Sequence, residues 1–99
     1  METFVGDTVR LILKTGINIS GFTILEVRFK RPNGTTGIWT ASVYSGDNTW
    51  MEYITSTADI NIAGIWAVQV FVESPTGERL HGMWAEFTVY KPISDPVIP

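Results

Sequence analysis

The strongest constraint on the fold is a side-chain period of two, with no stretch of helical period. Polar and apolar residues alternate in extended segments that are separated by turn sequences, which is the pattern of half-buried strands. The six segments are Thr8–Lys14, Phe22–Lys30, Ile38–Tyr44, Thr49–Thr55, Ile65–Glu73 and Leu80–Tyr90. The turns are Thr15–Gly16, Ser20–Gly21, Pro32–Gly34, Gly46–Asn48 and Pro75–Gly77, with one more turn expected at Ser56–Ile60. Short strands rich in Val, Ile, Thr and aromatic residues predict an all-β domain.

The length of 99 residues predicts one domain, which we place at residues 1–91. The segment 92–99 contains three prolines and is expected to be an extended tail, with Val97 and Ile98 available to dock on a neighbouring subunit. There are no cysteines, so a disulfide framework and thiolate metal sites are excluded.

Alternation sorts each segment into two faces, of which one is expected to form the core. The predicted core residues are Val9, Leu11, Leu13, Leu25, Val27, Phe29, Trp39, Ala41, Val43, Met51, Tyr53, Trp66, Val68, Val70, Val72, Met83, Ala85, Phe87 and Val89. The remaining large apolar residues then face outward. On the last two segments these are Ile65, Phe71, Leu80, Trp84 and Tyr90, and on the first two they are Ile12 and Ile24. A contiguous apolar stripe on neighbouring strands is typical of a partner surface, so we expect the first five to form an assembly surface.

Charge and hydropathy limit the other partners. Charged residues make up only 17% of the chain, which suggests that part of the surface is covered by assembly into an oligomer. A net charge of −3 argues against nonspecific binding of nucleic acid, and Arg28, Lys30 and Arg31 are expected to be a solvated strand face. No apolar run is long enough to cross a membrane, and the first residues do not form a signal peptide.

The order Gly64, Trp66, Val68 resembles the corner at which immunoglobulin-like domains enter their second sheet. In that resemblance Val27, Trp39 and Val68 take the places of the core trio, with valines where the disulfide between the sheets would be. The indole N–H of Trp66 is expected to bond a backbone carbonyl. The resulting expectation is an immunoglobulin-like β-sandwich of about six to seven antiparallel strands.

The four-residue connection Ser74–Gly77 predicts a hairpin between the last two segments. Its simplest register places Arg79 and His81 on the inner face. A bulge at Gly82 would relieve this arrangement.

Catalytic groupings are absent from the pattern: His81 stands alone and no serine lies in a nucleophile elbow. Asp47 and Asn48, and Asp59 with Asn61, do not have the spacing of a calcium loop and are expected to be turn formers. We therefore expect a protein that is not an enzyme and holds no metal or cofactor. An alternative is a carbohydrate- or host-surface-binding module that uses Trp50, Trp84 and Tyr44.

The order of turn and strand motifs is similar to the N-terminal domain family of bacteriophage baseplate upper proteins and related short virion proteins. The matching motifs are Gly6–Thr8, Asn18–Ser20, Arg31–Gly34, Tyr53, Asp59–Ile60, Gly64–Trp66 and Gly77. The family often has aspartate where Asn18 stands, and its members commonly continue into a coiled coil or fibre, whereas this chain ends at Pro99. The resemblance implies a virion structural protein, either a tail or baseplate subunit or a head accessory or decoration subunit. Such a protein is made in the host cytoplasm, binds other virion proteins and carries no catalytic residues.

Overall fold

The computed structural model describes residues 3–92, except for the side chain of Met83. Within this range there are strands and turns but no helix. The strands are β1 (Thr3–Phe4), β2 (Arg10–Lys14), β3 (Ile24–Lys30), β4 (Thr36–Thr40), β5 (Ser42–Val43), β6 (Trp50–Ile54), β7 (Gly64–Glu73) and β8 (Arg79–Tyr90). The predicted all-β class is confirmed. The predicted tail, including Val97 and Ile98, lies almost wholly outside the described residues.

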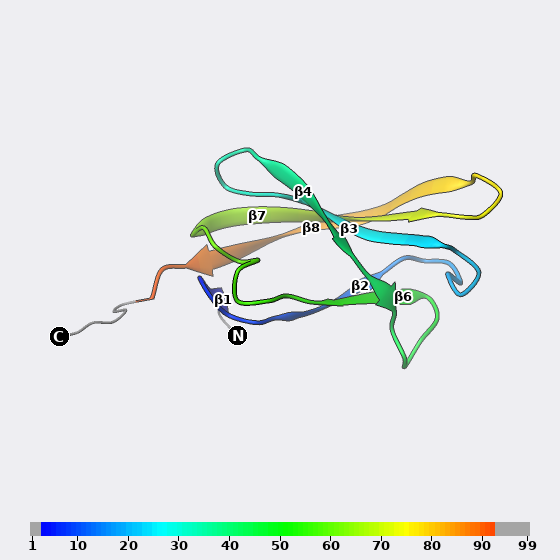
Figure 1. Ribbon diagram of the computed structural model, residues 1–99, viewed down its shortest axis with the longest axis horizontal. Coiled ribbons are helices and arrows are strands. Elements are labelled where there is room, and N and C mark those ends of the chain that lie inside the picture. Colours follow the sequence, from blue (N-terminus) through cyan, green and yellow to red (C-terminus); the bar gives the residue numbers. More distant parts are fainter. Residues whose placement is uncertain (1–2, 93–99) are drawn as a thin grey trace.

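The strands form two sheets, which we call the large sheet and the small sheet (Figure 1). The large sheet has five strands in the order β1-β8-β7-β3-β4, and the small sheet has three in the order β2-β6-β5. All pairings are antiparallel except that of β1 with β8, which is parallel. Both sheets contribute to one core, so each has an inner face toward the core and an outer face toward solvent.

One predicted strand is divided between the two sheets. The segment Ile38–Tyr44 was expected to be continuous, but β4 ends at Thr40 in the large sheet and β5 begins at Ser42 in the small sheet. Ala41 between them still donates its N–H to the carbonyl of Leu25, at 2.9 Å. The chain therefore crosses from one sheet to the other at a residue with a small side chain. The short strand β1 was not predicted.

The core contains most of the predicted inner residues. The buried members are Ile19, Leu25, Val27, Phe29, Trp39, Met51, Ile60, Trp66, Val68, Val70, Val72 and Val89, and Leu11, Leu13, Ala41, Val43, Tyr53, Ala85 and Phe87 pack against them while partly exposed. The core is built around stacked aromatic rings: Trp39 stacks on Tyr53 of the small sheet at 5.1 Å and on Trp66 at 6.1 Å. Offset stacking of this kind adds to the gain from burial and links the two sheets.

The hairpin of β7 and β8 departs from the simplest register. Val68 lies opposite Ala85 and Val72 lies opposite Leu80, with a register shift between Gln69 and Phe71. Two residues of β8, Gly82 and Met83, therefore oppose one residue of β7, which is a β-bulge at the position suggested by Gly82.

The bulge reverses the faces of the residues before it. Phe71 lies opposite His81 and Glu73 lies opposite Arg79. The expectation that Arg79 and His81 face inward is thus wrong, and both lie on the outer face of the large sheet. Leu80, expected on the outer face, lies on the inner face beside Val72.

The expectation that Val27 and Val68 face each other across the two sheets is also wrong. Val27 pairs with Val70, and Phe29 with Val68, in neighbouring strands of the large sheet. Val27 and Val68 therefore do not take the places of a disulfide that joins two sheets. The small sheet supplies Met51, Leu11 and Leu13 to the opposite wall of the core.

Candidate functional site

The corner before β7 is fixed by packing and by one hydrogen bond. Trp66 is fully buried, and its indole Nε1–H donates to the carbonyl of Ile62 at 2.8 Å, as the sequence predicted. Gly64 has a φ of +132°, and a Cβ there would lie 2.7 Å from the Cβ of Pro32. Only glycine fits this position without strain, so the corner serves the fold rather than a ligand.

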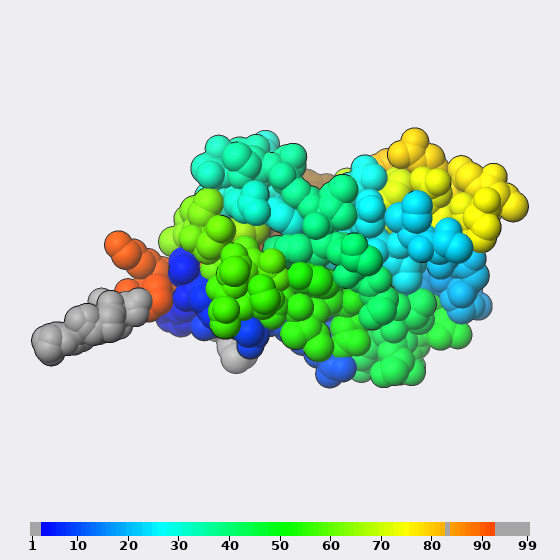
Figure 2. All heavy atoms as spheres, viewed as in Figure 1, coloured from blue at the N-terminus to red at the C-terminus, as the bar shows by residue number. Residues whose placement is uncertain are grey.

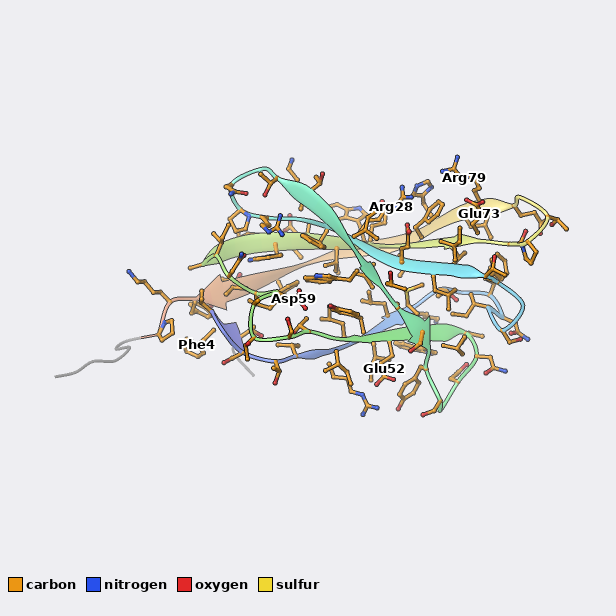
Figure 3. The ribbon with its side chains drawn as sticks, in the orientation of Figure 1. Phe4, Arg28, Glu52, Asp59, Glu73 and Arg79 are labelled. Atoms are coloured by element: carbon orange, nitrogen blue, oxygen red, sulfur yellow. The ribbon has the colours of Figure 1, made fainter. Side chains whose placement is uncertain are left out.

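Near the corner lies a partly buried hydrogen-bond group centred on Asp59, which Figure 3 places between the two sheets. Its Oδ2 accepts from the Tyr53 hydroxyl at 2.8 Å and from the Ser56 N–H at 2.7 Å. Burial alone would raise the pKa of Asp59, but the hydrogen bonds from Ser56 and Tyr53 lower the pKa by more, and it ends below its ordinary value. Burial and the neighbouring carboxylate raise the pKa of Tyr53 to about 12. Both groups keep their usual charge at neutral pH, and their hydrogen bond ties the loop to the small sheet.

The outer face of the large sheet carries a mixed row of side chains. The row runs across four strands because Arg28 pairs with both Ile38 and Gln69, and Gln69 pairs with Trp84. Trp84 is 60% exposed and Ile38 is 52% exposed. The Gln69 side-chain amide donates to the carbonyl of Gly82 at 3.3 Å, which holds it across the bulge.

This row lines a hollow in the outer face of the large sheet. The hollow has a volume of about 820 Å³ and is lined by residues that include Lys30, Thr36, Ala67 and the four members of the row. Ala67 pairs with Lys30, and Lys30 pairs with Thr36, so a small side chain lies on each side of Lys30 in the hollow. Figure 2 shows the upper outline of the molecule dipping between β4 and the β7–β8 hairpin. We call this hollow and its lining the outer-face hollow.

The five residues predicted as an assembly surface do not form one stripe. Ile65, Trp84 and Tyr90 are exposed at 59%, 60% and 44% on the outer face, but Ala67 and Glu86 separate Ile65 from Trp84. Leu80 is 45% exposed but lies on the inner face, where it lines a small cavity with Thr15 and Ile17, the residues that follow β2.

Phe71 points outward as predicted but is only 2% exposed. The guanidinium of Arg28 lies 3.8 Å from the centre of its ring and that of Arg79 lies at 5.4 Å, while the His81 ring packs beside it at 5.0 Å. Figure 3 shows Arg28, Arg79 and Glu73 together on this side of the molecule. Cation–π contacts and the stems of long basic side chains thus remove Phe71 from the expected surface.

The three residues of the alternative sugar site are divided between two faces. Trp84 lies on the outer face of the large sheet. Trp50 pairs with Lys14 and bonds through its carbonyl to the N–H of Tyr44, so Trp50 and Tyr44 lie on the outer face of the small sheet. On that face Arg10 forms an ion pair with Glu52 and lies over the ring of Tyr44. One sugar cannot contact all three residues.

The polar residues considered for metal binding act in turns. Asp47 accepts from the N–H and the hydroxyl of Thr49, and these bonds lower the pKa of Asp47. Among the described residues no group of three or more histidine, cysteine or carboxylate side chains is arranged to hold a metal ion. His81 lies exposed beside Phe71.

Sequence reasoning missed the contribution of β4 to the outer-face hollow. Ile38 precedes the inward Trp39, and alternation alone would have placed it outward, so a signal was present in the sequence. The roles of Ala67 and Gln69 gave no such signal, because they depend on the order of the strands in the sheet.

No known protein-family model matches this chain, and no curated protein matches it significantly. The part of the chain that the structure describes contains no helix long and apolar enough to cross a membrane.

Proposed function

We propose that this protein is a non-enzymatic virion structural protein with an immunoglobulin-like sandwich fold, acting by assembly with other proteins. Its place in the virion would be the tail, the baseplate or the head surface, where it would bind other virion proteins as an oligomer. The virion assignment rests on the similarity to the baseplate upper protein family. The immunoglobulin-like assignment is supported by the strand orders, with a short parallel first strand beside the last strand of the large sheet.

The observation that carries the proposal is the outer-face hollow. Trp84 and Ile38 stand exposed at its sides, with the polar groups of Arg28 and Gln69 between them. Interfaces commonly combine an aromatic anchor with arginine and a polar rim, and a few such residues supply most of the binding energy.

The proposal is tested on virus particles from the host strain that carries the gene. Mass spectrometry of the purified particles is expected to find the chain in stoichiometric amounts. Absence of the chain from the particles would contradict the virion role.

The contact surface is tested by adding purified chain back to particles that lack it. We expect the native chain to co-sediment with these particles and Trp84→Ala to bind at least about tenfold more weakly, because exposed tryptophans at interfaces are frequent anchors. Trp50→Ala is the matched control on the small sheet and should bind like the native chain. Equal binding by both variants would contradict the use of the outer-face hollow.

A second candidate is a carbohydrate-binding module, which the exposed ring of Trp84 beside Arg28 and Gln69 favours. An aromatic face with a few fixed polar groups is the usual composition of a small-ligand site. Tryptophan fluorescence titrated with cell-surface glycans would then change saturably in the native chain and in Trp50→Ala, but not in Trp84→Ala. A titration without saturable change in the native chain would remove this candidate.

A further inference from the structure

Within residues 3–92, the outer edge of β4 has backbone hydrogen-bonding groups without a backbone partner. β4 is the last strand of the large-sheet order, and Figure 1 shows it at the top of the view, from where the chain crosses toward the small sheet. Arg31 donates to Thr35 and Ala41 donates to Leu25, so in the β3–β4 register the hydrogen-bonded positions of β4 are Gly37 and Trp39. The N–H and C=O groups of Thr36, Ile38 and Thr40 therefore point away from β3.

This edge lacks the features that normally prevent strand addition. Natural proteins protect edge strands with charged residues, prolines or bulges. The sequence of β4 is Thr-Gly-Ile-Trp-Thr, with no charge and no proline, and its pairing with β3 is regular along its whole length. An unprotected edge of this kind is expected to be covered in the functional state.

We infer that β4 pairs with β4 of a second copy of this chain in an antiparallel dimer centred on Ile38. Thr36 of one copy then lies opposite Thr40 of the other, and the two Ile38 side chains meet on the outer face. The pairing is isologous, since each copy contributes the same surface, and it joins the two large sheets into one. This inference rests on the assembly function proposed above and specifies how copies of the chain associate.

Charge complementarity supports a second copy as the occupant. On the outer face Lys30 lies beside Thr36 and Glu26 lies beside Thr40, so one end of the edge is basic and the other is acidic. Antiparallel pairing brings Lys30 of each copy toward Glu26 of the other, twice by symmetry. The two β3 strands are three spacings of about 4.8 Å apart, or about 14 Å at the backbone, and side chains that lean over the threonines bring the opposite charges closer than this without direct contact. Parallel pairing would instead place like charges together.

The centre of the interface is compatible with this arrangement. Arg28 lies beside Ile38 in each copy and contacts only Oε1 of its own Glu26, at 3.3 Å, which leaves Oε2 of Glu26 to face Lys30 of the other copy. The chain leaves the edge at Ala41 to enter the small sheet, so pairing is limited to Thr36–Thr40.

The decisive variant is Ile38→Pro. Proline at position 38 removes an N–H that β3 does not use, so the fold should persist while strand addition is blocked. In sedimentation velocity over about 1 to 100 µM, the native chain and Ile38→Val are expected to form dimers, and Ile38→Pro is expected to lose at least about tenfold in dimer affinity. Circular dichroism and tryptophan fluorescence verify that the proline variant is folded. An unfolded proline variant leaves the test to the charge variants described next.

Charge reversal tests the register without touching the backbone. Glu26→Lys alone and Lys30→Glu alone should each weaken self-association, because each places like charges face to face. A mixture of the two variants should form heterodimers, since the basic positions of one face the acidic positions of the other. Failure of the mixture to associate would overturn the proposed register.

The test of edge pairing can be distinguished from the test of the virion role. A native chain that stays monomeric, or a folded Ile38→Pro chain that still forms dimers, would overturn edge pairing. A monomeric native chain would also contradict the oligomer in the proposed function, whereas the binding to virus particles is measured separately and tests the virion role. Trp84→Ala should keep the dimer and lose particle binding.

Discussion

At the scale of single residues, Asp59 shows how a small domain without disulfides fixes a loop. Its carboxylate accepts from Tyr53 in the small sheet and from Ser56 in the loop, while Tyr53 stacks on Trp39 of the large sheet. A partly buried carboxylate that accepts several hydrogen bonds is favoured in its ionised form, and a phenol that donates to it is favoured in its neutral form. The hydrogen bond between Tyr53 and Asp59 is therefore weakened both at low pH, where Asp59 becomes protonated, and at high pH, where Tyr53 becomes ionised.

The pH dependence of stability follows from these two shifts. The pKa of Asp59 is lowered from 3.8, so its contribution is complete above that value and is lost as the pH falls through the folded pKa. The pKa of Tyr53 is raised from 10.0 to about 12, so its contribution is complete below 10.0 and is lost as the pH rises toward 12. Urea unfolding at a series of pH values should show the free energy of unfolding decreasing at low pH, which we call the acid limb, and at high pH, which we call the alkaline limb.

Conservative variants assign each limb to its residue. Asp59→Asn should flatten the acid limb, and Tyr53→Phe should flatten the alkaline limb. Each should also lower the free energy of unfolding at neutral pH by about 0.5–1.5 kcal/mol, because Phe removes the hydroxyl donor and Asn replaces the ionised acceptor with a weaker neutral one. Limbs that are unchanged in both variants would show that other groups govern the pH dependence.

At the scale of elements, the bulge in β8 sets which side chains reach the outer face. Gly82 and Met83 oppose Val70, and a Cβ at Gly82 would lie 3.1 Å from the Cβ of Val70. Because of the bulge, Arg79 and His81 lie over Phe71 instead of in the core. One extra residue in one strand therefore covers a phenylalanine and removes it from the assembly surface.

Deletion of Gly82 should remove the bulge and keep the faces. Met83 alone would then oppose Val70, while Phe71 would still pair with His81 and Glu73 with Arg79, because loss of the extra residue restores regular alternation. The free energy of unfolding should fall by less than about 1 kcal/mol, since no charge becomes buried and Phe71 stays covered. Thermal denaturation measures the change, and binding of a hydrophobic dye should not rise. A large loss of stability together with increased dye binding would contradict this pairing at the bulge.

At the scale of the whole molecule, stability depends on contact between a large sheet and a much smaller one. The small sheet reaches the common core mainly through Met51, Tyr53, Leu11 and Leu13. In a domain of 99 residues a few such contacts make up a considerable part of the net stability.

A matched pair on β6 tests this dependence. Met51→Ala removes a fully buried side chain and should cost about 2–5 kcal/mol in the free energy of unfolding. Ile54→Ala, on the exposed face of the same strand, should change it by less than about 0.5 kcal/mol. Denaturant unfolding with unchanged slopes compares the two. Equal losses would mean that the small sheet does not share the core.

The strand segments, their turns and most of the buried residues could be predicted from the sequence. Alternation is a local property, and it placed Val27, Trp66 and Val68 inward and Trp84 outward before any pairing was known. The turn chemistry of Asp47 and the hydrogen bond of Trp66 followed from residue type in the same way. The outer-face hollow was predictable only in part, through Trp84.

Tertiary structure decided the features that depend on which strands are neighbours. Only the strand order places Ile38, Arg28, Gln69 and Trp84 in one row, and only the crossing at Ala41 separates β4 from β5. The cover over Phe71 comes from side chains on two other positions in the fold, Arg28 and Arg79. A period of two specifies the face of a side chain within its own strand, whereas pairing partners, bulges and cover arise from contacts between segments distant in the sequence.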